Sequence, residues 1–171
     1  MVSVKVVIPV YRKLNEMESI ALSNNIRVLS GYPVVFVKPE GLDISQVTDA
    51  YPEAMVAEVT TDWIGTKRGI AGYNEMMMSE DFYSMFSDAE YILVCHTDAW
   101  IFRDELLGWC GTGYDVVAAP WPTRPRYKRF PFKQIIRLKT NILPPPRAFV
   151  RMAGFTLWNV WKSRQRRSVV A

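Results

Sequence analysis

The chain has 171 residues, of which 49% are hydrophobic and 22% are charged, and this balance is typical of one globular domain rather than a disordered or fibrous chain. No apolar run approaches the roughly 20 residues that a transmembrane helix requires, and the strand-like start is too short for a signal peptide. The two cysteines, Cys95 and Cys110, form neither a disulfide framework nor a metal-site spacing. We therefore predict a reducing, cytoplasmic setting.

The net charge of +4 hides a strong asymmetry between two parts of the chain. Residues 1–119 hold 8 Lys or Arg against 17 Asp or Glu, a balance of −9, whereas residues 120–171 hold 13 basic residues and no acidic one. Such a basic segment is typical of regions that meet phosphates, nucleic acid or an anionic membrane surface. A solvated tail has the same composition, so charge alone names no partner.

The first forty residues predict a β-α-β unit. Val2 to Val10 has the composition of a strand, and Pro9 suits its end, where no ladder donor is needed. A helix follows, with Asn15 as its candidate cap; its apolar residues at helical spacing are Leu14, Met17, Ile20, Ala21 and Val28. Val34 to Val37 is the second strand. This order favours a parallel sheet with helices packed on it.

A glycine-rich basic loop is predicted after a third strand over Val56 to Val59. Gly65 to Gly72 contains Lys67 and Arg68 and leads into a helix-like run, Tyr73 to Met78. Such a loop can offer free N–H groups to phosphate oxygens. It matches neither the Walker A nor the dinucleotide pattern, and a flexible loop with two solvated cations is the alternative.

A buried strand that ends in a carboxylate is the main candidate for chemistry. Tyr91 to Cys95 is long enough and apolar enough for a strand covered on both faces, and it stops at His96-Thr97-Asp98. Ligands of open α/β sheets bind beyond the carboxyl ends of the strands. Asp98 is therefore a candidate functional residue, although a turn-forming Asp is the alternative.

The remaining elements complete an α/β pattern. Phe82, Tyr83 and Phe86 form an aromatic helix face that we assign to the core. Val116 to Ala119 is a further short strand, and Phe155 to Trp161 is one more short element. Between them, basic and aromatic residues alternate from Thr123 onward, a pattern compatible with single-stranded nucleic acid or an acidic lipid surface.

Six phrases of the chain occur in an order that a known family shows. They are Ile8-Pro-Val-Tyr-Arg12, the run from Tyr32 to Leu42, Gly72-Tyr-Asn74, Asp81-Phe-Tyr83, the run from Thr97 to Leu106, and Ala118-Ala-Pro-Trp121. As an ordered set they resemble a bacterial family of predicted glycosyltransferases with the nucleotide-diphospho-sugar transferase (GT-A) fold. The match covers roughly Lys5 to Trp121.

The resemblance implies a single-domain, Rossmann-like α/β fold with a mostly parallel sheet and helices on both faces. It implies a nucleotide-sugar-binding core over residues 1–122 and a basic extension over residues 123–171 that is an incomplete acceptor-side region. In such enzymes the end of the first strand holds the nucleotide base, and a following loop and helix approach the ribose and diphosphate. The residues placed there are Pro9, Val10, Tyr11 and Arg12, then Lys67, Arg68, Gly72, Tyr73 and Asn74.

The resemblance also implies a metal site. The family's DxD-like motif reads His96-Thr97-Asp98 in this chain, so that His96 and Thr97 lie beside the nucleotide sugar and Asp98 matches the carboxylate that touches the cation. Mn²⁺ or Mg²⁺ suits such a site, because a divalent ion stabilises a departing diphosphate. His96 is a weak candidate for the catalytic base, and a hydrogen-bonded strand cap is the favoured alternative.

Two further expectations concern the acceptor side. Trp100 and Trp121 are candidate platforms for a sugar ring, with core packing as the alternative. Gly154-Phe-Thr-Leu157 matches imperfectly a family segment that precedes an acidic pair resembling the catalytic base, and no acidic residue follows Asp115. The region expected to carry the catalytic base is missing, so either the chain is a truncated or frame-disrupted product, or the missing function comes from elsewhere; no catalytic base is assigned.

The leading prediction is a metal-dependent glycosyltransferase that moves a sugar from a nucleotide-diphosphate donor to an unknown glycan or lipid-linked acceptor. One alternative is a catalytically inactive module that binds a nucleotide sugar. The other is a basic protein that binds nucleic acid or an anionic membrane surface through residues 120–171. Peripheral contact with the inner membrane face is compatible with the leading prediction, and nucleic acid is the less favoured partner.

Overall fold

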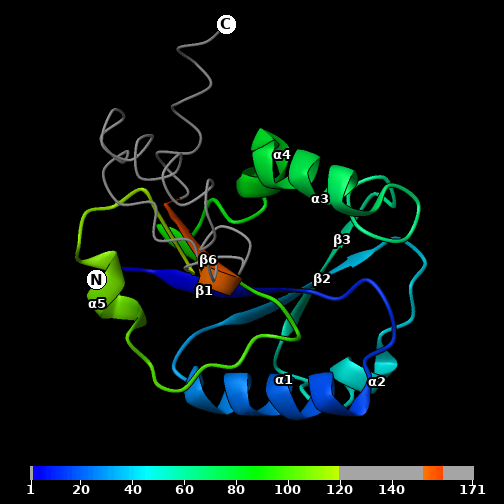
Figure 1. Ribbon diagram of the computed structural model, residues 1–171, viewed down its shortest axis with the longest axis horizontal. Helices are drawn as coiled ribbons and strands as arrows, with labels where there is room; N and C mark the ends of the chain where they lie inside the picture. The colour runs from blue at the N-terminus through cyan, green and yellow to red at the C-terminus, as the bar shows by residue number, and fades with distance from the viewer. Residues whose placement is uncertain (1, 120–151, 160–171) are drawn as a thin grey trace, which may run out of the picture.

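The computed structural model describes residues 2–119 and 152–159, which form one six-stranded sheet with helices packed against it (Figure 1). In chain order the elements are β1 (Val4–Pro9), α1 (Glu16–Val28), β2 (Val34–Pro39), α2 (Ser45–Thr48), β3 (Met55–Val59), α3 (Gly69–Met78), α4 (Glu80–Ser84), β4 (Tyr91–Cys95), α5 (Leu106–Cys110), β5 (Val116–Ala119) and β6 (Met152–Asn159).

The sheet has the strand order β3-β2-β1-β4-β6-β5. Strands β3, β2, β1 and β4 are parallel to one another, whereas β6 lies between β4 and β5 and runs antiparallel to both. The predicted α/β class and the mostly parallel sheet are therefore confirmed. The short element predicted near Phe155 is β6, which belongs to the same sheet as residues 2–119.

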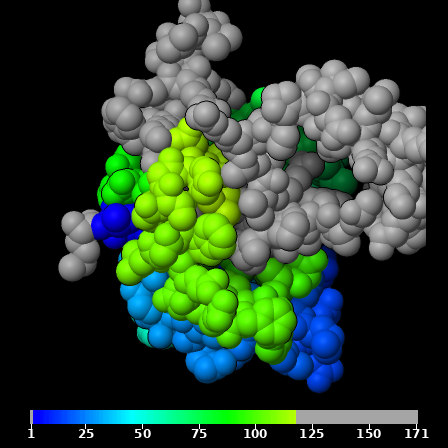
Figure 2. Space-filling model, turned by 60° about the vertical axis from the view of Figure 1, so that its left-hand side comes forward, coloured from blue at the N-terminus to red at the C-terminus, as the bar shows by residue number. Residues whose placement is uncertain are grey.

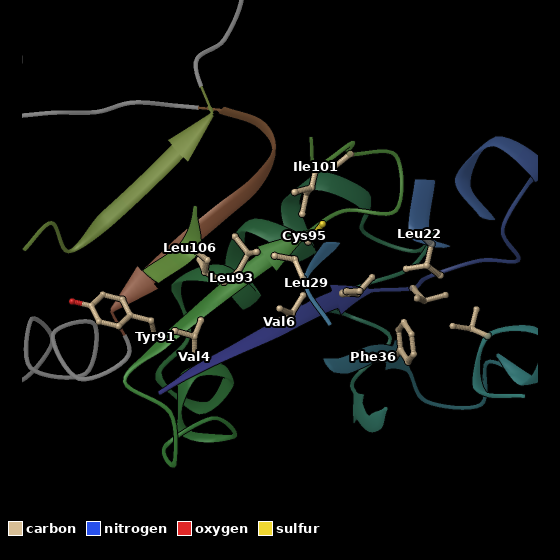
Figure 3. Packing of buried hydrophobic residues seen from close by; sticks show 14 of the residues in the cluster. Val4, Val6, Leu22, Leu29, Phe36, Tyr91, Leu93, Cys95, Ile101 and Leu106 are labelled. Atoms are coloured by element: carbon tan, nitrogen blue, oxygen red, sulfur yellow. The ribbon is translucent and has the colours of Figure 1, made fainter. Parts of the chain in front are cut away.

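Alternate side chains of the central strands enter two separate cores, as the period of two along a strand requires. Val6 and Leu93 face α1, α2 and α5, where they pack with apolar residues of these helices (Figure 3). Val7 and Val94 face the opposite layer, formed by α3 and α4, which carries the predicted aromatic core residues. Figure 1 shows α1 and α2 on one side of the sheet and α3 and α4 on the other, so the predicted two-sided cover is confirmed.

Helix α1 begins where its sequence predicts but buries only part of the predicted apolar set. The Asn15 side chain accepts a hydrogen bond from the Glu18 backbone N–H, and the Glu18 carboxylate accepts one from the Asn15 N–H, which completes a capping box. Met17, which fits the apolar spacing, is 74% exposed. The buried residues of the helix are Glu18, Ala21, Leu22 and Asn25, of which Ala21 belongs to the predicted set. Polar residues occupy the buried face because their side chains have specific partners, described below.

The glycine-rich loop is shorter than the sequence indicates, because α3 already begins at Gly69. Gly72 is therefore a helical residue, and it lies where the backbone of α3 crosses that of the preceding loop. A Cβ atom at Gly72 would stand 2.1 Å from the Asp62 carbonyl oxygen. Only glycine allows this close approach, so the residue fixes how α3 sits beside the sheet.

No helix in the described ranges, 2–119 and 152–159, has the length and apolar character needed to cross a membrane.

Candidate functional site

The candidate site lies at the carboxyl ends of β1 and β4, the two strands in the middle of the parallel part of the sheet. From β1 the chain goes to β2 on one side and, later, to β4 on the other, so the strand order reverses at this point. Ligands of open α/β sheets bind in the crevice at such a switch. Val7 pairs with Val94, and Pro9 and His96 each lie two residues beyond this pair, at the same edge.

The β1 end presents one fixed backbone segment and two exposed side chains. Val10 is buried and its N–H donates to the Val37 carbonyl at 2.8 Å, which extends the pairing with β2. Tyr11 is 42% exposed, and the Arg12 guanidinium stands 5.7 Å from the centre of its ring. Of the predicted base-binding residues, Pro9 and Val10 are therefore buried, and Tyr11 and Arg12 face solvent.

Arg12 is held in place by a buried carboxylate. Its two terminal nitrogens donate to the two oxygens of Glu18 at 2.6 and 2.9 Å. This bidentate hydrogen bond and the charge of Glu18 raise the pKa of Arg12. Because the same carboxylate belongs to the capping box of α1, the β1 end is fixed to that helix.

The β4 end places Asp98 in solvent. Thr97 is buried, whereas Asp98 is exposed. Within the described part of the chain, no hydrogen bond or ion pair involves the Asp98 side chain. The Ala99 N–H donates to the His96 carbonyl at 3.1 Å, so Asp98 stands in a tight turn directly after the strand. A turn-forming Asp normally bonds its own backbone, whereas the Asp98 carboxylate bonds no backbone group in the described ranges.

His96 is joined to α3 rather than to Asp98. Its Nε2 lies 3.0 Å from the Tyr73 hydroxyl, and the two ring centres are 5.3 Å apart. Burial lowers the pKa of His96, against a smaller raising effect of the Asp98 charge. Burial also raises the pKa of Tyr73. The contact between His96 Nε2 and the Tyr73 hydroxyl therefore links the end of β4 to α3.

The two cations of the glycine-rich loop already have carboxylate partners. Lys67 lies 2.8 Å from Asp62, and Arg68 lies 2.7 Å from Glu75. All four side chains are at least 42% exposed, so each pair contributes little to stability. Of the neighbouring predicted residues, Asn74 is exposed, whereas Gly72 is buried against the backbone of Asp62.

Exposure alternates along the segment that follows Asp98. Ala99 and Ile101 are buried, whereas Trp100 is 47% and Phe102 is 87% exposed. The predicted sugar platform Trp100 is thus available at the surface, and Phe102 is a second exposed aromatic that the sequence patterns did not single out. The other predicted platform, Trp121, lies outside the described residues.

The donor set at this edge suits a hard divalent cation with few protein ligands. Among the residues that the structure describes, no group of three His, Cys, Asp or Glu side chains could hold a metal by itself. Mg²⁺ and similar ions commonly take one or two carboxylates and complete their shell with phosphate oxygens and water. Asp98, which is exposed and bonds no other residue that the structure describes, fits this mode of binding.

Two residues of this site lie on α1 and carry no motif. Glu18 and Asn25 are seven residues apart, two helical turns, so both project from the same face. Each is buried and bonds a loop at the carboxyl edge of the sheet. A polar pair at a spacing of seven within an otherwise apolar face was the signal that could have identified them.

Comparisons with known proteins place the chain in a family. The model of a family described as "Protein of unknown function (DUF5672)" matches residues 54–162, which is more than half of the chain. The chain belongs to this family. Its matched residues include Asp98 and the whole of α3, α4, β4 and β6. No curated protein sequence matches the chain.

Two solved structures share the fold. The galactosyltransferase LgtC, solved with donor and acceptor sugar analogues, is 14% identical with a TM-score of 0.56. The mannosyltransferase PcManGT from Pyrobaculum calidifontis, solved with GDP-Man and Mn²⁺, is 16% identical with a TM-score of 0.50. The matches cover 94% and 91% of this chain, but only 59% and 44% of those proteins. The chain therefore has the GT-A fold, as its sequence predicts.

Proposed function

We propose that this protein binds a nucleotide-diphosphate sugar together with Mn²⁺ or Mg²⁺ at the carboxyl ends of β1 and β4, and transfers the sugar to an acceptor. The observation that carries the proposal is the position of Asp98. It is an exposed carboxylate at the topological switch of a GT-A sheet, and it bonds no side chain in residues 2–119 or 152–159. Such switch points are where open α/β sheets bind their ligands.

The residues around Asp98 suit distinct parts of a nucleotide sugar. Tyr11 offers an exposed ring for a base, and Arg12, although paired with Glu18, keeps its guanidinium near that ring. Lys67 and Arg68 precede α3, where cations and free N–H groups favour phosphate. Tyr73 and His96 fix α3 against the β4 end, and Asn74 is exposed one residue further along.

Asp98 would hold the cation, whose charge would stabilise the diphosphate as it departs. The protein's own contribution is to keep that carboxylate in place and free of competing partners. Trp100 and Phe102, exposed directly after Asp98, would receive the apolar face of a sugar on the acceptor side. His96 serves as a positioning group in this proposal, because its Nε2 is engaged by Tyr73.

A thermal-shift experiment tests the binding half of the proposal. The wild type is heated with UDP or GDP, each with and without Mn²⁺, beside Asp98→Asn and the matched control Glu53→Gln. Glu53 is an exposed carboxylate directly before β3 and thus at the opposite edge of the sheet. A ligand at 100 times its Kd stabilises the folded state by about 2.7 kcal/mol. We expect a Mn²⁺-dependent rise in Tm for the wild type and Glu53→Gln, and none for Asp98→Asn.

Turnover is tested separately, because an inactive module would give the same shift. Release of nucleoside diphosphate from UDP- and GDP-sugars is followed with Mn²⁺, with and without candidate glycan acceptors. Release that disappears in Asp98→Asn supports transfer. A Mn²⁺-dependent shift without any release would leave binding as the function of the chain, and the absence of any shift would exclude both.

A further inference from the structure

Two asparagines of α1 bind the backbone directly after Asp98. The Asn25 amide donates to the Ala99 carbonyl at 2.8 Å, and its oxygen accepts the Ile101 N–H, also at 2.8 Å. The neighbouring Asn24 donates to the Ile101 carbonyl at 2.8 Å. Three backbone groups of the segment Ala99–Ile101 are therefore hydrogen-bonded to side chains of α1.

The Asn25 amide pairs with the backbone N–H and C=O groups of this segment, as the backbone of a neighbouring strand would. One planar group offers a donor and an acceptor to the two backbone groups that face it, and Asn25 is only 2% exposed. Its nitrogen also lies 3.6 Å from the Cys95 sulfur at the end of β4. Figure 3 shows Cys95 and Ile101 at this end of the α1-side core. The amide therefore bridges the strand end and the segment that leaves it.

These bonds restrain the turn that carries Asp98 from both sides. Before the turn, β4 is paired with β1 as far as Val94 and with β6 as far as Cys95. Inside it, the Ala99 N–H bonds the His96 carbonyl. After it, the Ala99 carbonyl is held by Asn25. The backbone is thus restrained at His96 before Asp98 and at Ala99 after it, although the Asp98 side chain bonds no described residue.

We propose that Asn25 is a positioning residue for Asp98, and that it sets the cation affinity of the site through the Ala99–Ile101 backbone, with Asn24 in a lesser supporting role. The inference rests on the proposed function, because it takes Asp98 to be the ligand of Mn²⁺ or Mg²⁺. A carboxylate whose backbone is already fixed loses less conformational freedom when it binds a cation. Figure 2 shows the residues after β4 lying against the surface of α1, so the restraint acts over a continuous contact.

The first measurement needs no ligand. Hydrogen exchange is followed at the Ile101 and Ala99 amides in the wild type, Asn25→Ala and the milder Asn24→Ala. A lost hydrogen bond should speed exchange at Ile101 by roughly tenfold relative to the β4 amides in Asn25→Ala. The change in Asn24→Ala should be smaller. Unchanged exchange at Ile101 in Asn25→Ala would show that the amide does not restrain the segment, and would overturn the proposal.

The second measurement asks whether the restraint reaches Asp98. The Mn²⁺ concentration for half-maximal binding of UDP or GDP is determined for the same variants at a temperature where all are folded. The control is Leu29→Ala, which removes a buried apolar side chain from the same core but no hydrogen bond to the Ala99–Ile101 backbone. We expect Asn25→Ala to need roughly tenfold more Mn²⁺, and Leu29→Ala to match the wild type however much stability it loses.

The outcomes separate this inference from the proposed function. Faster exchange at Ile101 with an unchanged Mn²⁺ requirement would reduce Asn25 to a structural residue and overturn its positioning role. A wild type that binds neither nucleotide with Mn²⁺ would overturn the proposed function, and the positioning role with it, while the exchange result would still stand. If Asn25→Ala does not fold, both measurements are made on Asn24→Ala. Faster exchange at Ile101 and a higher Mn²⁺ requirement are then expected, and no change in either would overturn the proposal.

Discussion

The two helical layers of this protein bury different kinds of side chain. The α3–α4 layer packs Met76, Phe82 and Phe86 against the sheet, and these are fully or almost fully buried. The α1 layer also buries Leu22 and Leu29, but it adds the carboxylate of Glu18 and the amide of Asn25. In the described ranges, no buried polar or charged residue other than tyrosine lies on α3 or α4.

This difference indicates that the two layers contribute differently to stability and to the position of the loops. Burying a polar group is unfavourable unless a partner compensates it, and the partners of Glu18 and Asn25 are loops at the carboxyl edge of the sheet. Glu18 fixes the loop after β1, and Asn25 fixes the loop after β4. We infer that the buried apolar residues of α3 and α4 mainly stabilise the fold, whereas the buried polar residues of α1 also hold the loops after β1 and β4.

The largest expected effect comes from a cavity in the α3–α4 layer. Phe82 is completely buried and contacts the rings of Tyr83 and Phe86 at centre distances of 5.4 and 5.3 Å. Phe82→Ala should reduce the free energy of unfolding by about 3–5 kcal/mol, measured by urea denaturation. Nucleotide binding by the folded fraction should not change. If Phe82→Ala lost as much nucleotide affinity as Asn25→Ala, the proposed difference between the α1 layer and the α3–α4 layer would be wrong.

A medium effect is expected where α3 meets the loop before it. Gly72→Ala places a Cβ against the Asp62 carbonyl, and relieving such a backbone clash should cost about 1–3 kcal/mol. Gly108→Ala is the matched control, since Gly108 lies within α5 with nothing within 4 Å of its added Cβ. There alanine should be neutral or stabilising by up to about 1 kcal/mol. Equal effects at the two sites would contradict the close approach.

The smallest stability effects compare a helix cap in each layer. Asn15→Ala and Ser79→Ala each remove a side chain that accepts a backbone N–H at the start of a helix, α1 or α4. Both should cost about 1 kcal/mol in chemical denaturation. Only Asn15→Ala should also weaken nucleotide binding, because Asn15 shares Glu18 with Arg12. Identical nucleotide affinities of the two variants would show that the Asn15 cap does not contribute to the binding site.

Much of the fold could be predicted because it rests on local patterns. The buried run Tyr91–Cys95 is the predicted two-sided strand, and Asn15 caps α1 through its own neighbours in sequence. The contacts between segments could not be read in this way. Asn25 reaches Ala99 across 74 positions, and Gly72 is required by a backbone crossing that no periodicity reveals. Met17 fits the apolar spacing but is exposed, because the polar partners of Glu18 and Asn25 decide which face turns inward.

In the candidate site, too, a local pattern could be predicted from the sequence, whereas the side-chain pairs could not. The sequence singles out Asp98 from the abrupt end of an apolar strand, and the structure leaves that carboxylate exposed at the switch point. It does not reveal that Lys67 and Arg68 pair with Asp62 and Glu75. The roles of all these residues toward a ligand stay predictions.

Calorimetric titration of UDP and GDP, with and without Mn²⁺, tests the central claim most directly when it is applied to Asp98→Asn beside the wild type and Glu53→Gln. Asp98 bonds no described side chain, so its replacement should hardly change the free energy of unfolding, and any change in binding reports on the site alone. We predict tight, Mn²⁺-dependent binding of one nucleotide by the wild type and Glu53→Gln, and loss of that dependence in Asp98→Asn. Equal affinity and equal Mn²⁺ dependence in all three proteins would contradict it.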